Sequence, residues 1–449
     1  MKVRRESRGV ALLLVVATIA ILSIVLLEFS MRSRLHLQAG ANLRNQVRAV
    51  TAADTALVLT RACLDPEAWG ALKSFQDNVD LESLCGMMLS IFTQSRIDLP
   101  IGGLSLELGG VQGIGLVGGH VELQMRSEES FIGLAGLHCA GRGSTGSNCA
   151  NRKTTARKLR AILCDPSVAD VFESEQEDGH RYTREEIIGN LVDWIDPDDN
   201  RIQYDPVTNQ FLEGTENEDS YYTDLPGNQR YRSKDAPFDS IEELRMVKGV
   251  NEAIFQHLKD KVSVHSSGKI DVNTASAQVL ATLLRAESGW FQAMENQGNS
   301  CGQDSETLKQ GEAALNLYVR MILDARKLKQ APNPLSKPFR GSSGTGLFIK
   351  VLQNPLASIM ASSGQLAGAL FGQVTEDMVL QRYNLTPGQY IELQKEFSRY
   401  ANNLTQSITT ESNLLRVQAL GESGGINRRV SAVLKKDGNT VRTLYYREE

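Results

Sequence analysis

An uncharged run close to the N-terminus constrains this chain more than any other feature. Residues 10–27 read "VALLLVVATIAILSIVLL" and contain no charged side chain. At a helical rise of about 1.5 Å per residue, this length matches the roughly 30 Å hydrocarbon core of a bilayer. The run is preceded by four basic residues: Lys2, Arg4, Arg5 and Arg8. Positive charge favours the cytoplasmic side of a membrane, so we expect the chain beyond Glu28 to lie across it.

A cleaved secretory signal is the alternative interpretation of the same run. The apolar part of such a signal usually spans about 7 to 15 residues and ends at a small-residue site of the Ala-x-Ala kind. The run here is longer, and no clean site of that kind follows it. We therefore favour a retained membrane helix.

The first helix is expected to continue well beyond the bilayer. No proline occurs before Pro66. Apolar residues recur over that stretch at helical spacing: Leu43, Val47, Val50 and Leu57. A single helix over residues 10–63 would be on the order of 80 Å long. Its second half would carry an apolar stripe on which a domain can pack.

Length and charge are those of a globular protein without a nucleic-acid surface. The 449 residues allow two or three domains at the usual size of about 100 to 200 residues. Lysine and arginine number 48 against 53 aspartates and glutamates. The resulting net charge of −5 argues against a surface built for phosphate backbones.

The cysteines show none of the spacings typical of zinc or haem sites: Cys63, Cys85, Cys139, Cys149, Cys164 and Cys301. Because the orientation argument places all of them beyond the membrane, they can form disulfides. Six cysteines allow fifteen full pairings, and spacing does not choose among them. We favour Cys139 with Cys149, which would close a glycine-rich loop. We also favour Cys63 with Cys85, which would tie the end of the long helix to the segment after it.

Alternating patterns on both sides of a helical region predict one small sheet. Within residues 101–125, "IGGLSLELGG" and "GGHVELQM" alternate apolar and polar residues between glycine clusters. Near the C-terminus, residues 430–434 and 441–445 alternate on either side of an Asp-Gly turn, which predicts a β-hairpin. Between these regions, residues 151–404 show helical periodicity. We therefore expect a sheet that is interrupted by a helical block.

An acidic segment is the strongest internal signal: "NLVDWIDPDDNRIQYDP" followed by "LEGTENEDSYYTDLPG". Asp196, Asp198 and Asn200 reproduce the first three side-chain positions of a calcium-binding EF-hand loop. The match then ends, because Arg201 occupies the position of the turn glycine and Val207 occupies the position of the bidentate glutamate. A metal site would therefore draw ligands from the later acidic half. Without a metal, acidic loops are commonly solvated or cap helices.

Residues 238–284 predict two helices around a glycine turn, then a short strand and a third helix. This order resembles a helix-hairpin-helix, whose DNA-binding versions hold a phosphate at a Gly-x-Gly turn. Here Gly249 is followed by Val250 and Asn251, and acidic residues surround Lys248. We therefore favour a structural module over a DNA-binding one.

Sequence signatures of catalysis are missing. No HExxH or Walker A motif occurs, and the six histidines form no recognisable constellation. Paired carboxylates such as Glu128 and Glu129 are expected to be solvated surface groups. We expect that the chain is not an enzyme.

The leader and the first helix resemble the class III signal of type IV pilins and type II secretion pseudopilins. In that family the prepilin peptidase cuts after the leader's last glycine, here Gly9, and methylates the new amine, here on Val10. Most members carry a glutamate at the fifth mature position, where this sequence has Leu14. A carboxylate in lipid costs roughly 2.5 to 3.5 kcal/mol, and in pilins it pairs with the amine of the preceding subunit. Leu14 fits a first subunit at a filament tip, and the family known for lacking that glutamate is minor pseudopilin K, general secretion pathway protein K.

The resemblance implies an α+β, pilin-like fold. In that fold a long N-terminal transmembrane helix packs on a small antiparallel sheet, which is interrupted by a large inserted α-helical domain with helix-hairpin-helix or SAM-like modules. The implied organisation is a leader at 1–9, a helix at 10–63 with its transmembrane part at 10–27, a pilin-like domain at 64–150 and 405–449, and the inserted domain at 151–404. The glycine-rich loop at 139–149 and the stretch at 288–373 fit the family less well and look like insertions.

The same resemblance implies a calcium site and a set of partners. "DWIDPDD" followed by "ED" and "YY" is similar to the family's signature, and the residues that match its calcium site best are Asp196, Asp198, Glu218 and Asp219. The implied partners are pseudopilins I and J, the major pseudopilin, the prepilin peptidase and the inner-membrane assembly platform. The implied function is a tip subunit, anchored in the inner membrane with a periplasmic domain, that initiates and caps the pseudopilus in protein export across the outer membrane. The alternatives are a tip minor pilin of a type IV pilus and a membrane-anchored helix-hairpin-helix protein that binds DNA.

Overall fold

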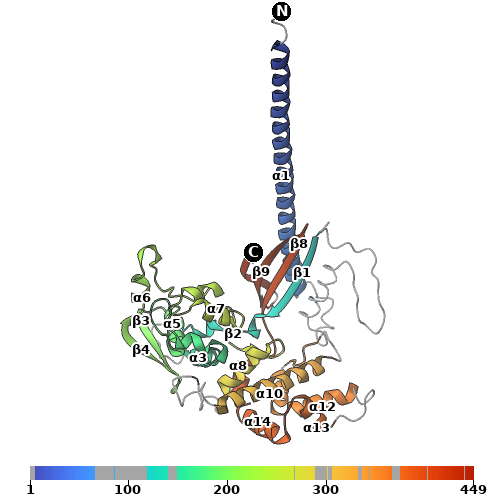
Figure 1. The fold of residues 1–449 in the computed structure, drawn as a ribbon. Coiled ribbons are helices and arrows are strands. Elements are labelled where there is room, and N and C mark those ends of the chain that lie inside the picture. The colour runs from blue at the N-terminus through green and yellow to red at the C-terminus, as the bar shows by residue number, and fades with distance from the viewer. Residues whose placement is uncertain are drawn as a thin grey trace, which may run out of the picture.

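The computed structural model describes residues 6–65, 85, 119–139, 149–266, 268–288, 301, 306–331, 336–341, 343–366, 375–401, 403–438 and 440–449. A long helix stands on a small sheet, and a larger helical block lies on the side of the sheet away from the N-terminus (Figure 1). The C-terminus lies at the sheet. The strand expected at 101–110 lies outside the described residues, as do most of the glycine-rich loop and parts of 288–373.

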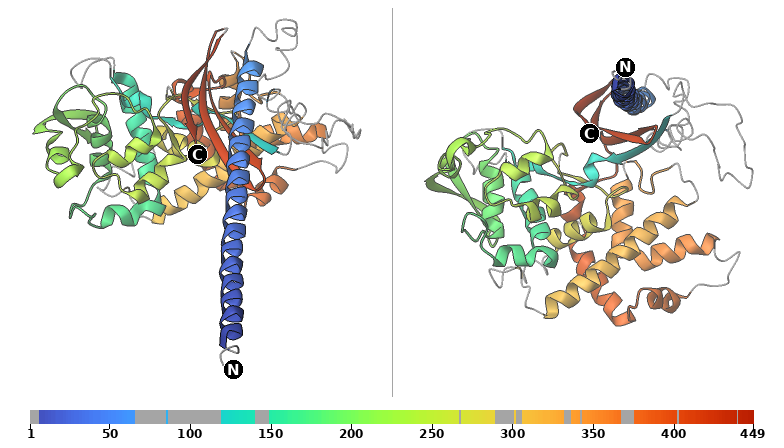
Figure 2. Two further views of the ribbon diagram at one scale, coloured as in Figure 1. Left: turned by 90° about the horizontal axis from the view of Figure 1, so that it is seen from above. Right: turned by 45° about the horizontal axis from the view of Figure 1, so that its top comes forward.

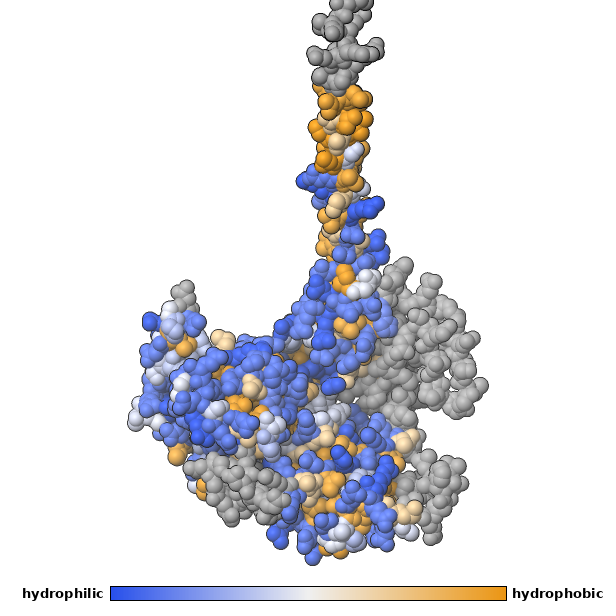
Figure 3. Space-filling view, viewed as in Figure 1, coloured by the Kyte–Doolittle hydropathy of each residue, from blue (hydrophilic) through white to orange (hydrophobic). Residues whose placement is uncertain are grey.

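The first helix, α1 (Glu6–Leu64), is continuous over 59 residues and confirms the predicted long helix. By length and composition it is the one candidate membrane span in the part of the chain that the structure describes. Residues 11–40 are exposed throughout, and apolar side chains cover the outer half of the helix (Figure 3). Gly9, Val10 and Leu14 all lie in the first turns of α1.

Four antiparallel strands form the sheet, in the order β1-β8-β9-β10. Their bounds are β1 (Gly119–Ser127), β8 (Leu414–Ser423), β9 (Ile426–Asp437) and β10 (Thr440–Glu448). The predicted C-terminal hairpin is confirmed as β9 and β10, which turn at Gly438 with a φ of 59°. The central strand β8 was not predicted, because Ala419 and Gly421 interrupt its apolar alternation.

Small residues let α1 lie close to the sheet. Its buried face is built from Ala49, Ala52, Ala53 and Ala56. A Cβ on Gly421 of β8 would lie 2.0 Å from the carbonyl oxygen of Ala49, so a side chain there would push the helix away. Apolar side chains of the sheet complete this core: Val121, Val417, Val430, Leu434 and Val441.

The helical block occupies the chain between β1 and β8. Its α-helices are α3 (Ala150–Leu163), α4 (Ala169–Glu173), α5 (Arg184–Asp193), α6 (Ser220–Thr223), α7 (Glu252–Lys259), α8 (Ala277–Glu287), α10 (Glu306–Gln330), α11 (Gly344–Gln353), α12 (Pro355–Leu366), α13 (Glu376–Arg382) and α14 (Pro387–Tyr400). Short 3-10 helices join them: η2 (Glu128–Ser130), η3 (Leu134–Leu137), η5 (Pro166–Val168), η6 (Gly227–Gln229), η7 (Ile241–Met246) and η8 (Asn403–Gln406). The half with α3 to α8 and the half with α10 to α14 lie side by side (Figure 2).

Strands also occur inside this block, and they are more numerous than the one short strand that the sequence predicts there. An antiparallel hairpin is formed by β3 (Asn200–Asp205) and β4 (Gln210–Asn217). Two short parallel pairs join distant segments: β2 (Ile132–Gly133) with β5 (Val262–Ser263), and β6 (Ile270–Asp271) with β7 (Ile408–Thr409). The hairpin lies in the acidic segment, where the sequence predicts a loop.

The predicted helical pair around Gly249 is present with one change. Its first member, η7, is a 3-10 helix of six residues, and Gly249 makes the turn with a φ of 78°. Its second member is α7, where the Asn251 side chain accepts a hydrogen bond from the Ile254 N–H at 3.0 Å. The strand β6 and the helix α8 follow in the predicted order.

Three disulfides join the six cysteines. Cys63–Cys85 and Cys139–Cys149 are bonded, which confirms both favoured pairs. The third bond, Cys164–Cys301, ties the end of α3 to the segment before α10.

Glu128 was expected at the solvated surface, and this expectation was wrong. The residue is 0% exposed and lies in η2, directly after β1. Its carboxylate accepts hydrogen bonds from Arg416 at 2.7 and 2.8 Å and from the Ser263 hydroxyl at 2.7 Å. These partners are distant in sequence, so the local pattern at Glu128 could not reveal them.

Candidate metal centre

The candidate site lies where α5 ends. The helix begins with a capping box, in which the Thr183 hydroxyl accepts from the Glu186 N–H at 3.1 Å and the Glu186 carboxylate accepts from the Thr183 N–H at 2.8 Å. Buried apolar residues hold its inner face in the core: Ile187, Ile188, Leu191 and Val192. The last residue of α5, Asp193, is therefore carried into the interior and is 4% exposed.

The β3–β4 hairpin brings the second acidic half back to this point. The Ile202 N–H donates to Asp193 Oδ1 at 2.7 Å, which orients the carboxylate. A Cβ on Gly189 would lie 2.5 Å from the Ile202 carbonyl oxygen, so glycine permits the close approach of β3 to α5. At the far end of the hairpin, the Glu218 N–H donates to the Asp199 carbonyl at 3.2 Å. The two acidic halves therefore meet.

Three carboxylates converge at the end of the hairpin that lies opposite its turn. Asp193, Asp196 and Glu218 each place an oxygen within 4.8 Å of the other two. They are 4%, 2% and 6% exposed, respectively. Both oxygens of Asp196 and Oε2 of Glu218 have no hydrogen-bond partner among the residues that the structure describes. Buried oxygens of this kind are costly unless a cation or a proton compensates them, and hard carboxylate oxygens suit calcium.

Burial and mutual repulsion raise the pKa of all three carboxyl groups. Burial is the main cause in each case, and neighbouring carboxylates add to it. The pKa rises to about 8 for Asp193, to about 7 for Asp196 and to about 10 for Glu218. Without a cation, the cluster therefore holds protons at neutral pH, and a bound metal ion would replace them.

A guanidinium group from another element faces the cluster. Arg152, near the start of α3, places Nη2 3.7 Å from Asp196 Oδ2, and its side chain is 1% exposed. Its Nε donates to the Leu137 carbonyl at 2.8 Å, and the guanidinium carbon lies 5.7 Å from the centre of the Phe211 ring. The cluster is thus partly neutralised by the protein itself.

Aromatic side chains cover the cluster. Trp194 packs edge-on against Tyr222 at 5.6 Å and against Tyr231 at 6.0 Å between ring centres. Tyr222, the second residue of the "YY" pair, is 2% exposed, and its hydroxyl accepts from the Lys248 N–H at 3.1 Å. Tyr222 and Tyr231 therefore contribute packing beside the carboxylates.

The structure brings two of the four predicted ligands into the cluster, Asp196 and Glu218. Asp198 lies at its edge, where Oδ1 accepts from a backbone N–H at 3.0 Å. Asp219 is also peripheral, and its Oδ1 accepts from the N–H and the hydroxyl of Ser233, each at 2.8 Å. As ligands, Asp198 and Asp219 stay predictions.

Asp193 is the cluster member that sequence reasoning did not select. It lies three residues before Asp196, and this spacing places both on one side of a helical turn, which was the usable signal. Ser233 and Asp235 also join the site from a later loop, where Ser233 Oγ lies 3.0 Å from Glu218 Oε1. Nothing in the local sequence of that loop indicated this contact.

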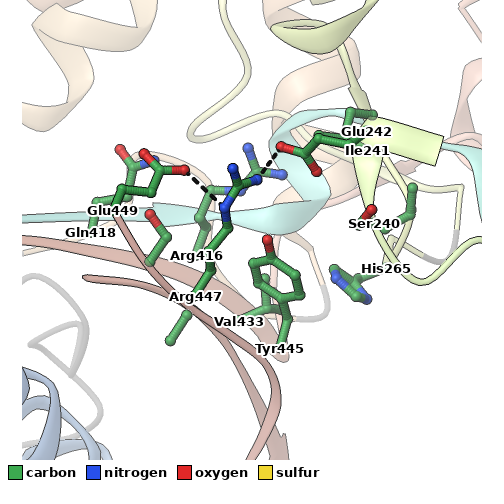
Figure 4. Close-up of a pocket in the computed structure, with 13 residues that line it drawn as sticks. Ser240, Ile241, Glu242, His265, Arg416, Gln418, Val433, Tyr445, Arg447 and Glu449 are labelled. Carbon is green, nitrogen blue, oxygen red and sulfur yellow. Dashed lines mark hydrogen bonds and ion pairs between the residues drawn. The ribbon is translucent and has the colours of Figure 1, made fainter. Parts of the chain in front are cut away.

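A small cavity lies at the joint between the sheet and the helical block (Figure 4). Its volume is about 130 Å³. His265 packs on Tyr445 at 5.9 Å between ring centres, and Arg447 pairs with Glu242 across the joint and with Glu449 at 3.2 Å. The charged groups here compensate one another, as expected of a contact between two parts of one chain.

Comparison with known proteins gives one family and a set of distant structures. Residues 174–267 match the family described as type II secretion system (T2SS), protein K. One chain of "The Crystal Structure of the GspK-GspI-GspJ complex from enterotoxigenic Escherichia coli Type 2 Secretion System" is 15% identical, with 86% of this chain and 98% of that chain covered and a TM-score of 0.38. That score is too low to carry positions from one structure to the other. No curated protein matches the chain.

Proposed function

We propose that this chain is a minor pseudopilin at the tip of the pseudopilus, because residues 174–267 match the type II secretion system protein K family. The family match carries the proposal, and it covers the β3–β4 hairpin and the carboxylate cluster. The long exposed helix on a small sheet supports it, because such a helix can join a bundle of similar helices. We propose no catalytic activity.

The residue at position 14 supports a place at the tip. A carboxylate in the membrane part of α1 would need the amine of an earlier subunit as its partner. Leu14 needs none and is 63% exposed, so a first subunit can occupy the bilayer without an unpaired charge. The helical block lies at the end of the molecule away from the N-terminus, where it would cap the filament (Figure 1).

Apolar residues of α1 beyond the membrane run need cover in an assembled filament: Leu35, Leu37, Leu43 and Val47. We propose that the first helices of pseudopilins I and J cover them and that the three chains form the tip. The major pseudopilin would add to the filament after these three tip subunits. Assembly would take place on the inner-membrane platform, after the prepilin peptidase cuts between Gly9 and Val10. The N-terminus would be cytoplasmic and the domains periplasmic, a compartment in which the three disulfides are stable.

We further propose that Asp193, Asp196 and Glu218 hold calcium, with Asp198 and Asp219 at the edge of the site. The unpartnered oxygens of Asp196 and Glu218 support this assignment. Calcium supplies the charge that lets the buried carboxylates stay ionised together. The three side chains then hold the end of α5 against the end of β4. Because the ion binds only the folded arrangement, it adds to the stability of the block.

Size-exclusion chromatography of the ectodomain from about Ser33 onward tests the proposal. Residues 11–40 are exposed throughout, so this truncation removes no core contact. We expect a stable complex when the ectodomain is mixed with the ectodomains of pseudopilins I and J in calcium, and a weaker one in chelator.

Three separate peaks in both buffers would contradict the partner assignment. A complex with minor pilins of a type IV pilus instead would support the type IV pilus alternative. Salt-dependent binding of DNA by the ectodomain would favour the helix-hairpin-helix alternative.

A further inference from the structure

We propose that Arg152 is an internal counter-ion that sets the cation preference of the carboxylate cluster. The proposal rests on the calcium site proposed above and concerns how that site discriminates between ions. Arg152 lies outside residues 174–267, so the family match does not include it.

The position of Arg152 points to an electrostatic role. The separation of 3.7 Å from Asp196 Oδ2 is too long for a hydrogen bond, and the two side chains are 1% and 3% exposed. Nη1 is buried and has no hydrogen-bond partner within the described part of the chain. The guanidinium therefore acts on the cluster through its charge.

Other contacts hold the guanidinium in place. Its Nε donates to the Leu137 carbonyl, and its plane lies beside the Phe211 ring of β4. The helix that carries Arg152 starts directly after Cys149, which is bonded to Cys139. These contacts hold the guanidinium beside the cluster, so its charge is part of the site.

The charges of the cluster then match a divalent ion. Three ionised carboxylates carry three negative charges, and Arg152 leaves a net charge of −2. A buried net charge is costly, so an ion of charge +2 fits best. Arg201 also faces Asp193, but it is 24% exposed and pairs with Glu216 at 2.6 Å. Asp198, Asp219 and Asp235 lie at the more exposed rim. Without Arg152 the buried charge becomes −3, which a trivalent ion matches.

Metal titrations of the full-length protein in detergent test this inference. Calcium binding is followed by calorimetry, and terbium binding by its luminescence on excitation of tryptophan, since Trp194 adjoins Asp193. For R152M we expect calcium to bind on the order of tenfold more tightly and the ratio of terbium to calcium affinity to rise further. R160M is the matched control, because Arg160 is also on α3, is 7% exposed and pairs with Glu185 at 2.8 Å. R160M should keep both wild-type values.

The outcomes separate the two proposals. Absence of calcium and terbium binding in the wild type overturns the calcium site and this inference with it. The role of Arg152 alone is overturned if the wild type binds calcium but R152M keeps the wild-type ratio of terbium to calcium affinity. It is also overturned if R160M changes that ratio as much as R152M does. Folding of R152M only in the presence of calcium supports the inference. If R152M folds in neither buffer, R152K is the deciding variant. It keeps the positive charge, so its ratio of terbium to calcium affinity must equal that of the wild type. A raised ratio in R152K contradicts the inference.

Discussion

Single residues in the carboxylate cluster would change their ionisation state on binding the calcium proposed above. Asp193, Asp196 and Glu218 share one small space, where full ionisation is unfavourable without a positive charge. Protons supply that charge when no metal is present, and calcium supplies it when the ion binds. Acidity and calcium should therefore act in opposite directions on the same three groups.

Stability in chelator should fall as pH rises. The pKa values of about 8, 7 and 10 lie above the ordinary values of about 4 for unfolded carboxyl groups. The folded state therefore holds protons that the unfolded state has lost, and this stabilisation is full below about pH 4 and is lost as pH rises through the folded pKa values. Thermal unfolding in chelator should show a melting temperature that decreases from pH 5 to pH 9. Calcium should reduce that decrease, and identical pH profiles in both buffers would contradict the prediction.

The E218Q substitution should remove the calcium effect while leaving the metal-free fold nearly unchanged. Glutamine resembles the protonated Glu218 that the raised pKa of about 10 indicates at neutral pH. In chelator we expect a change in unfolding free energy within about 1 kcal/mol, whereas a stabilisation by calcium of about 2.7 kcal/mol at a hundredfold excess over Kd should be lost. D224N is the control, since Asp224 is exposed in the same acidic segment. Calcium-dependent melting curves of the three proteins check this.

At the scale of elements, α1 and the C-terminal hairpin could be predicted because their patterns are local. The uncharged run of α1, the lack of proline before Pro66 and the turn at Gly438 are visible in the sequence itself. The β3–β4 hairpin could not be, because its sequence is mostly polar and "IQYDP" carries only a short alternation. It is stabilised by contacts with α5, such as the one between Ile202 and Asp193. Missing this hairpin explains why Asp193 was not selected as a ligand.

The contact between α1 and β8 should be sensitive to one added methyl group. In G421A the new Cβ would lie 2.0 Å from the Ala49 carbonyl oxygen, so the helix must shift at a cost of about 1 to 3 kcal/mol or more. G388A is the control: Gly388 lies near the start of α14 with no atom within 4 Å of the new Cβ, and it should be neutral or stabilise by up to about 1 kcal/mol. Denaturant unfolding of both variants distinguishes the two effects. Equal stability of G421A and wild type would show that α1 is not held tightly on the sheet.

At the scale of the whole molecule, two separate cores are joined by a few polar contacts. One core lies between α1 and the sheet, and the other fills the helical block. Glu128 belongs to η2 at the start of the block and binds Arg416 of β8. The sequence indicated a sheet interrupted by helices, yet these contacts could not be predicted, since they depend on how the two cores face each other.

Breaking the buried contact should destabilise the molecule far more than breaking the exposed one. E128Q leaves Arg416, whose side chain is 26% exposed, without its charged partner, and the loss of such charged hydrogen bonds costs about 1.5 to 3 kcal/mol. The Arg447–Glu242 pair has side chains that are 42% and 39% exposed, so E242Q should cost at most about 1 kcal/mol. Arg416, the partner of Glu128, lines the same cavity as Glu242, which makes E242Q a matched control (Figure 4). Calorimetry should show an earlier transition for E128Q, and equal transitions in the two variants would contradict the ranking.

The register between β1 and β8 has an evolutionary consequence. Ser127, where the chain leaves the sheet, pairs with Leu415, where it has just returned. The whole helical block is therefore inserted between two neighbouring positions of one ladder, and its exit and entry points stay close whatever its length. Lineages could enlarge, trim or exchange the block without disturbing the face of the sheet that meets α1. The helical block is thus free to diversify without any change in the contact between α1 and the sheet.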